Sequence, residues 1–184
     1  MSLWGGGRHP NPKSMMKETL AIINQMQADG VIRKYAIGGA VGATFYLEPF
    51  ATLYIDIFVR FKNSGLLVDL SPIYTYLTAR GCTVKGEYIV IGEWPVQFLP
   101  SGNAMGDEAL EQAIETEVEG VRTWVMTAEH LVAIALQTGR SKDFARIVQF
   151  VESGKLDPNR LDDVLQRHDL IAKWKHFEDK YLKE

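Results

Sequence analysis

Apolar positions along the chain follow two different periods before and after residue 125. In the first part, short apolar runs separated by glycines alternate with segments whose apolar residues recur every three or four positions. From Thr127 onward, only the second, helical spacing is present. This pattern predicts an α+β fold in which a mixed sheet with flanking helices is followed by a C-terminal helical lobe.

Residues that begin and end elements place each helix and strand. Capping residues, prolines and terminal glycines predict helices over residues 20–29, 40–47, 70–80 and 109–115, and in the second part over 127–139, 141–154, 158–167 and 169–182. β-Branched and aromatic runs predict strands over residues 35–37, 52–61, 82–85, 87–91 and 94–99, and one or two strands within 118–126.

The same change of pattern divides the chain into three predicted regions. Residues 1–14 contain three consecutive glycines and two prolines without any helical or strand period, and we expect a disordered leader there. Residues 15–126 are predicted to form the α/β lobe and residues 127–184 the helical lobe. The leader lacks the apolar segment of a signal peptide, so we interpret it as a vector remnant or as the product of a start upstream of Met15 or Met16.

Composition and charge exclude several classes of protein. Hydrophobic residues make up 46% of the 184 residues and charged residues 23%, as in an ordinary globular protein. The formal net charge of −3 argues against a protein that coats DNA or RNA. No stretch approaches the 20 or so apolar residues of a membrane span. Cys82 is the single cysteine, so an internal disulfide is impossible, and we expect a cytoplasmic protein.

The first candidate functional residues lie in a glycine turn and in the following predicted strand, which contains one acidic residue. Gly38 and Gly39 follow the apolar run at 35–37, and residues 52–57 (TLYIDI) place Asp56 on the next strand. These glycines lack the G-x-G-x-x-G spacing, although Asp56 lies at a distance typical of the ribose-binding acid of a Rossmann unit, which stays a weaker alternative. The four histidines have no zinc-binding spacing.

Turn, strand and a segment of the helical lobe together resemble the nucleotidyltransferase superfamily, which has the polymerase-β-like fold. The AbiEii-like minimal bacterial group is the most similar, because residues 128–143 (AEHLVAIALQTGRSKD) follow its pattern P-E-x-L-h-A-x-K-L-x-A-x-R-x-K-D. The resemblance covers roughly residues 17–180. It implies a nucleotidyltransferase-like mixed sheet and a cleft between the two lobes.

The resemblance also implies roles for individual residues. Asp56 would be the catalytic carboxylate and a ligand of Mg²⁺, the implied cofactor, because magnesium prefers hard oxygen ligands. The other implied residues bind the nucleotide, and they are Gly38, Gly39, Arg140, Lys142 and Asp143. In such enzymes two magnesium ions hold a nucleoside triphosphate and activate a hydroxyl on RNA or protein for in-line attack.

Departures from the family pattern affect the metal site most. The family carries two carboxylates two residues apart on one strand, where they share a face, and a third on a neighbouring strand. Here Tyr54 stands at the first of these positions and Gln97 at the third, while Ala135 replaces the lysine of the helical segment. None of the nearby acids is a convincing replacement. Glu93 lies about 13 Å along the strand from Gln97, Asp69 lies beyond the strand, and Glu48 lies in the preceding loop, from which it could swing in.

Structural explanations compete with the functional ones at the same residues. Asp56 could be solvated at a sheet edge or paired with Arg60 or Arg140. Residues 141–143, Ser141, Lys142 and Asp143, also match an ordinary helix start.

The sequence leaves three hypotheses for the function of the protein. The first is a nucleotidyltransferase-fold protein that has lost or reduced transfer activity and binds a nucleotide or partner in its cleft. The second is an active Mg²⁺-dependent enzyme, and the third is a toxin–antitoxin-like interaction protein with a vestigial cleft.

Overall fold

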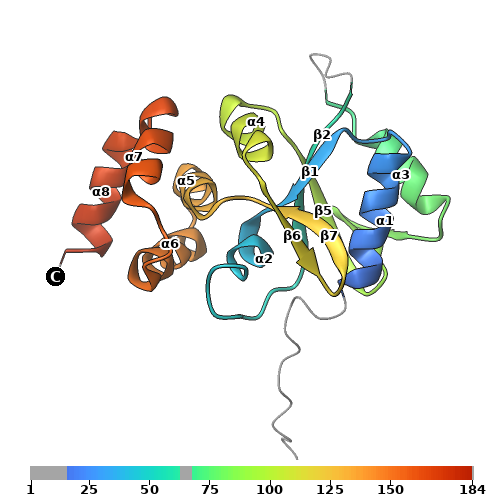
Figure 1. The fold of residues 1–184 in the computed structure, drawn as a ribbon, viewed down its shortest axis with the longest axis horizontal. Coiled ribbons are helices and arrows are strands. Elements are labelled where there is room, and N and C mark those ends of the chain that lie inside the picture. Colours follow the sequence, from blue (N-terminus) through green and yellow to red (C-terminus); the bar gives the residue numbers. More distant parts are fainter. Residues whose placement is uncertain (1–15, 63–67, 184) are drawn as a thin grey trace, which may run out of the picture.

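The structure, a computed structural model, describes residues 16–62 and 68–183, so the predicted leader at 1–14 lies outside the described residues. The described residues form one seven-stranded mixed sheet and eight helices (Figure 1). The strands are β1 (Lys34–Ile37), β2 (Ile55–Arg60), β3 (Thr83–Lys85), β4 (Tyr88–Ile91), β5 (Trp94–Pro100), β6 (Ile114–Val118) and β7 (Val121–Val125). The helices are α1 (Lys17–Ala28), α2 (Gly39–Ala43), α3 (Ser71–Thr78), α4 (Ala104–Glu111), α5 (Ala128–Thr138), α6 (Ser141–Ser153), α7 (Pro158–Arg167) and α8 (Ile171–Tyr181).

Strand order places β2 near the middle of the sheet. The order is β3-β4-β5-β2-β1-β7-β6, with β2 antiparallel to β1 and parallel to β5. In the β2–β5 register, Asp56 lies opposite Gln97. Residues directly opposite on neighbouring strands share a face of the sheet, so this register confirms that Gln97 belongs to the strand position beside Asp56.

Two hydrophobic clusters cover the two faces of the sheet. Alternate residues of β2, Ile55, Ile57 and Val59, are fully buried in the cluster that contains α1 and α3. The residues between them therefore point to the opposite face. The second cluster covers that face and includes α4 and helices α5 to α8 (Figure 1). Asp56 thus faces the side of the sheet on which the C-terminal helices lie.

A cluster of polar side chains ties the C-terminal helices to α4. The Glu108 carboxylate accepts hydrogen bonds from Nε2 of His130 (3.0 Å), Nε2 of His168 (2.9 Å) and the guanidinium of Arg167 (2.7 Å). These partners lower the pKa of Glu108 to about 2, with Arg167 contributing most. We call these four residues the Glu108 cluster; it joins α4, α5 and the end of α7.

Several predicted boundaries are wrong in an instructive way. The helix predicted at 109–115 is α4 at Ala104–Glu111, because the Asn103 side chain accepts a hydrogen bond from Gly106 N (2.8 Å) and begins the helix earlier. Ile114 instead begins β6, opposite Val125. The strand predicted at 52–61 begins only at Ile55, and the helix predicted at 40–47 is the short α2. None of the described helices is long and apolar enough to cross a membrane.

Candidate functional site

Two adjoining pockets lie where β2 faces the C-terminal helices. The first, of about 260 Å³, has an apolar wall formed by Phe58, Leu99, Met126, Leu131 and Ile134, and we call it the apolar pocket. The second, of about 420 Å³, is bordered by residues 50–54 and by α6, and we call it the basic pocket. Both are lined by Tyr54, Asp56, Arg140 and Arg146, so they meet at Asp56.

Most of the predicted site residues come together at these pockets. Gly39 and Asp143 line the apolar pocket and Lys142 the basic pocket, whereas Asp56 and Arg140 line both. Gly38 lies one residue away, and its N–H donates to the Asp56 carbonyl oxygen (3.0 Å) within the sheet. Their grouping agrees with the predicted cleft, while nucleotide binding by these residues stays a prediction.

Position 39 requires glycine for two reasons, its backbone conformation and the close approach of the Asp56 side chain. Its φ of +55° lies in the left-handed region that side-chain-bearing residues rarely adopt, and a Cβ there would overlap the Asp56 carboxylate. The turn therefore lets β1 enter α2 directly beside Asp56. This packing explains the Gly38-Gly39 signal in the sequence without invoking a phosphate.

Replacing Gly39 by alanine is expected to lower the free energy of unfolding by about 1–2 kcal/mol, from backbone strain and from overlap with Asp56. Gly86→Ala is the matched control, since Gly86 has a φ of +63° but open space around it. Urea unfolding of both variants should show the larger loss at Gly39, and Asp56→Ala should relieve part of it. Equal losses at the two glycines would contradict close packing at Asp56.

The Asp56 carboxyl is half-buried among positive charges. Burial raises its pKa to about 6, and the raising is opposed by Arg140, Arg146 and Lys142, in that order. The proposed pairing with Arg60 is wrong, because Arg60 forms ion pairs with Asp107 and Glu111 instead. Arg140 does not form an ion pair with Asp56 either; among the described residues it pairs with Asp143.

Asp143 holds the two arginines in place. Its buried carboxylate accepts hydrogen bonds from Arg140 Nε (2.7 Å) and from the Arg140 backbone N–H (3.3 Å), and lies 3.6 Å from the Arg146 guanidinium. The predicted helix start is therefore present, with Arg140 as the N-cap residue instead of Ser141. Asp143 caps α6 and positions Arg140 beside the pocket at the same time, so the structural and functional interpretations are compatible.

The two uncharged replacements lie beside Asp56, as the sequence indicated. Tyr54 immediately precedes β2, and both Tyr54 and Gln97 line the apolar pocket with Asp56. The Tyr54 ring packs on that of Tyr88, with centroids 5.0 Å apart. Gln97 donates a long hydrogen bond to Glu87 (3.4 Å), an acid in the turn between β3 and β4 that sequence reasoning missed.

This donor set does not fit a pair of magnesium ions. No group of three or more His, Cys, Asp or Glu side chains that could hold a metal occurs among residues 16–62 and 68–183. At the pocket junction, Asp56 is accompanied by a phenol and an amide where the resemblance implies carboxylates. Magnesium binding at Asp56 stays a prediction, but two ions would need more carboxylates than these residues provide.

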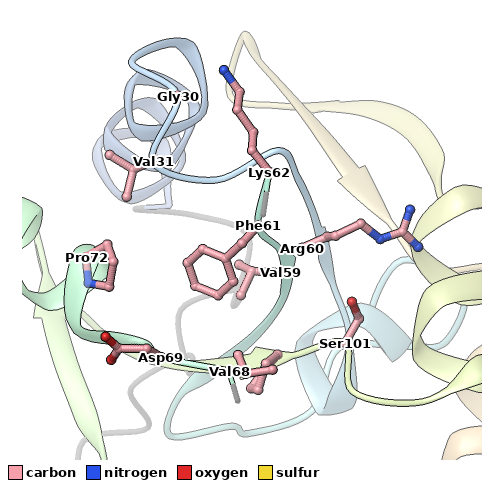
Figure 2. Close-up of a pocket in the computed structure, with 11 residues that line it drawn as sticks. Gly30, Val31, Val59, Arg60, Phe61, Lys62, Val68, Asp69, Pro72 and Ser101 are labelled. Atoms are coloured by element: carbon pink, nitrogen blue, oxygen red, sulfur yellow. The ribbon is translucent and has the colours of Figure 1, made fainter. Parts of the chain in front are cut away.

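Another hollow, of about 290 Å³, lies at the opposite end of β2. Gly30, Val31, Arg60 and Asp69 are among the residues that line it (Figure 2). Arg60 is held by Asp107 and Glu111, and the rim includes Lys62 and Val68, which border residues 63–67 outside the described part of the chain. We assign no site to this hollow.

Comparison with known proteins points to one fold. No family model and no curated protein matches the chain. A solution structure of the antibiotic-resistance factor ANT(2'')-Ia has 14% identity, covers 91% of this chain and 100% of that chain, and gives a TM-score of 0.52. A crystal structure of ANT(2'')-Ia in complex with adenylyl-2''-tobramycin has 13% identity, coverages of 88% and 98%, and a TM-score of 0.53. An antigenic nucleotidyltransferase-like protein from Paracoccidioides brasiliensis has 14% identity, coverages of 88% and 92%, and a TM-score of 0.51.

These likenesses establish the fold class that the sequence resemblance implied. The chain has a nucleotidyltransferase-like α+β fold, with a seven-stranded mixed sheet among the described residues. At 13–14% identity the likeness extends to the fold alone. Membership of the AbiEii-like group stays a prediction.

Proposed function

We propose that this protein binds a nucleotide in the cleft formed by the apolar and basic pockets, and that its nucleotidyl transfer activity is lost or much reduced. The nucleotide part is supported by the convergence of Asp56 with Arg140, Lys142 and Arg146 at one junction. The fold adds support, since one structural neighbour was solved with an adenylyl-bearing ligand, adenylyl-2''-tobramycin.

The observation that carries the loss of activity is the identity of the two side chains beside Asp56. In nucleotidyl transfer a hydroxyl oxygen bonds to the α-phosphorus, the hydroxyl loses its proton, and the bond to the pyrophosphate oxygen breaks. Clustered carboxylates hold the metal ions that stabilise the charge developing in such a displacement. Tyr54 and Gln97 are not carboxylates, so they cannot join Asp56 in holding metal ions.

Nucleotide binding and transfer are expected to separate experimentally. Each of the four ribonucleoside triphosphates, tested with and without Mg²⁺, should be scored for a rise in melting temperature and for pyrophosphate release. We expect a rise of a few degrees with at least one nucleotide, because a ligand that binds only the folded state stabilises it. Pyrophosphate should stay at the level of a no-protein control.

Other outcomes favour the other hypotheses. Release of pyrophosphate that is abolished by Asp56→Asn would establish the active Mg²⁺-dependent enzyme, with RNA or protein hydroxyls as the acceptors to test. Absence of binding for all four nucleotides in both conditions would favour the interaction protein with a vestigial cleft.

A further inference from the structure

The charges around Asp56 have the opposite sign from those expected around a metal ligand. In a magnesium site several carboxylates gather and the ion supplies the positive charge. Here Arg140, Arg146 and Lys142 all favour the ionised form of Asp56, and only Asp143, the smallest of these influences, opposes them. A divalent cation approaching Asp56 would have to overcome repulsion from these three side chains.

The positive charge is concentrated on one side of the pocket junction. Arg140, Lys142 and Arg146 line the basic pocket together with Asp56. The Asp143 carboxylate behind them pairs with both arginines. Three positive charges therefore face two negative ones, and Lys142 supplies the excess. In the apolar pocket, Arg140 and Arg146 are balanced by Asp56 and Asp143. An anionic group is therefore favoured in the basic pocket, and an uncharged ring or chain against the apolar wall.

The three cations keep donors that a ligand could use. Asp143 engages Nε and one terminal nitrogen of Arg140, and lies nearest to a single terminal nitrogen of Arg146. Each guanidinium has five N–H donors, so donors are left on both. Lys142 forms no hydrogen bond or ion pair with any other described residue. Arg146 is also fixed in place, since its side chain is only 14% exposed.

The glycine turn is a weaker candidate for the anion. The Asp56 carboxylate packs directly against Gly39, and the Gly38 N–H is already bonded to the Asp56 carbonyl oxygen. A phosphate placed at the turn would lie next to the carboxylate, whereas one in the basic pocket would meet three cations.

We propose that the cleft binds a polyphosphate-bearing ligand without a metal ion, and that Arg140, Lys142 and Arg146 neutralise its phosphates in place of magnesium. This inference rests on the proposed nucleotide binding and specifies how the phosphates are recognised. Guanidinium groups suit this role because their fork of donors matches two phosphate oxygens at once.

Calorimetric titration of the full chain with inorganic triphosphate and with ATP tests the proposal. Each titration is run in EDTA and again in excess MgCl₂, at low ionic strength because charge–charge contacts weaken with salt. We expect both ligands to bind in EDTA, and inorganic triphosphate to bind no more tightly when magnesium is present. The latter follows because magnesium bound to the phosphates cancels the charge that the three side chains recognise.

Three variants and one matched control assign the effect to the cleft. Lys142→Gln, at an exposed position where misfolding is not a concern, and Arg146→Gln should each weaken metal-free binding about 10- to 100-fold. Lys155→Gln is the matched control, since it removes a positive charge just beyond the end of α6 and outside both pockets; it should leave the affinity unchanged. Asp56→Asn should tighten metal-free binding by about threefold or more, because it removes the one negative charge that lines the basic pocket.

The titrations distinguish failure of this proposal from failure of the proposed nucleotide binding. Binding of ATP only in the presence of magnesium, with Asp56→Asn weakening it, would overturn the metal-free proposal and leave nucleotide binding intact. Binding of ATP but not of inorganic triphosphate in EDTA would overturn recognition through the phosphates. Binding of neither ligand in either condition would overturn both.

Discussion

Replacing Glu108 by alanine is expected to lower the free energy of unfolding by about 3 kcal/mol. The Glu108 carboxylate is only 18% exposed and accepts charge-assisted or buried hydrogen bonds from Arg167, His130 and His168. Hydrogen bonds to charged groups contribute about 1.5–3 kcal/mol each and are not additive within one cluster. The loss is measured by urea unfolding of the variant and the wild type at neutral pH.

Glu111→Ala provides the matched control on the same helix. Glu111 forms ion pairs with Lys34 and Arg60 but is 51% exposed, and exposed ion pairs contribute at most about 1 kcal/mol. The Glu108 variant should therefore lose at least twice as much stability as the Glu111 variant. Equal losses would mean that the Glu108 cluster does not hold α4 to the C-terminal helices.

The same cluster predicts an acid dependence of stability. The pKa of Glu108 is lowered to about 2 in the folded protein, whereas an unfolded glutamate titrates near 4.3. A lowered pKa means that the unfolded chain binds the proton more readily, so the contribution is complete above about pH 4.3 and disappears as the pH falls toward 2. The difference in stability between wild type and Glu108→Gln should shrink over that range.

Local sequence patterns predicted the elements that position the site. Gly38 and Gly39 directly follow β1, and Asp56 lies in a strand whose alternate residues are buried. The residues next to them in the sequence were therefore enough to predict their positions. The position of Gln97 beside Asp56 was predictable through the family resemblance, which implies a third carboxylate on a neighbouring strand and pointed to the strand at 94–99. The register of β2 with β5 confirms the position of Gln97 opposite Asp56.

Features that depend on distant residues were not predictable. His130 and His168 lie 22 and 60 residues from Glu108, and their spacing in the sequence indicated only the absence of a zinc motif. Glu87 contacts Gln97 from the turn between β3 and β4, and no local sequence pattern identifies it as a residue of the site. The early start of α4 was concealed by Gly106, a poor helix former, although Asn103 is a recognisable cap.

Restoring the two missing carboxylates is expected to create a magnesium response that the wild type lacks. Tyr54 and Gln97 line the same 260 Å³ pocket as Asp56, and Gln97 lies directly opposite Asp56 in the sheet. The double change Tyr54→Asp and Gln97→Asp would therefore place three carboxylates around one point. Without metal, repulsion among them should lower the free energy of unfolding by about 1–3 kcal/mol, although the nearby arginines reduce it.

Magnesium should then recover that loss in the variant. A cation that binds only the folded state at 100 times its Kd stabilises it by about 2.7 kcal/mol, which corresponds to several degrees in Tm for a domain of this size. The wild type, with Asp56 alone among three cations, should shift little. The measurement is thermal unfolding of both proteins across a magnesium titration, and the single variant Gln97→Asp should respond to an intermediate extent.

Two results would separate the competing views of this site. A wild type that responds to magnesium as strongly as the variant would mean that Asp56 already has sufficient ligands, with Glu87 the first to test, and the active enzyme would become the better hypothesis. A variant without any magnesium response would mean that Arg140, Lys142 and Arg146 still dominate the potential at the junction. In that case, adding Lys142→Gln to the double variant should restore the response, because it removes one of the charges that repel the ion.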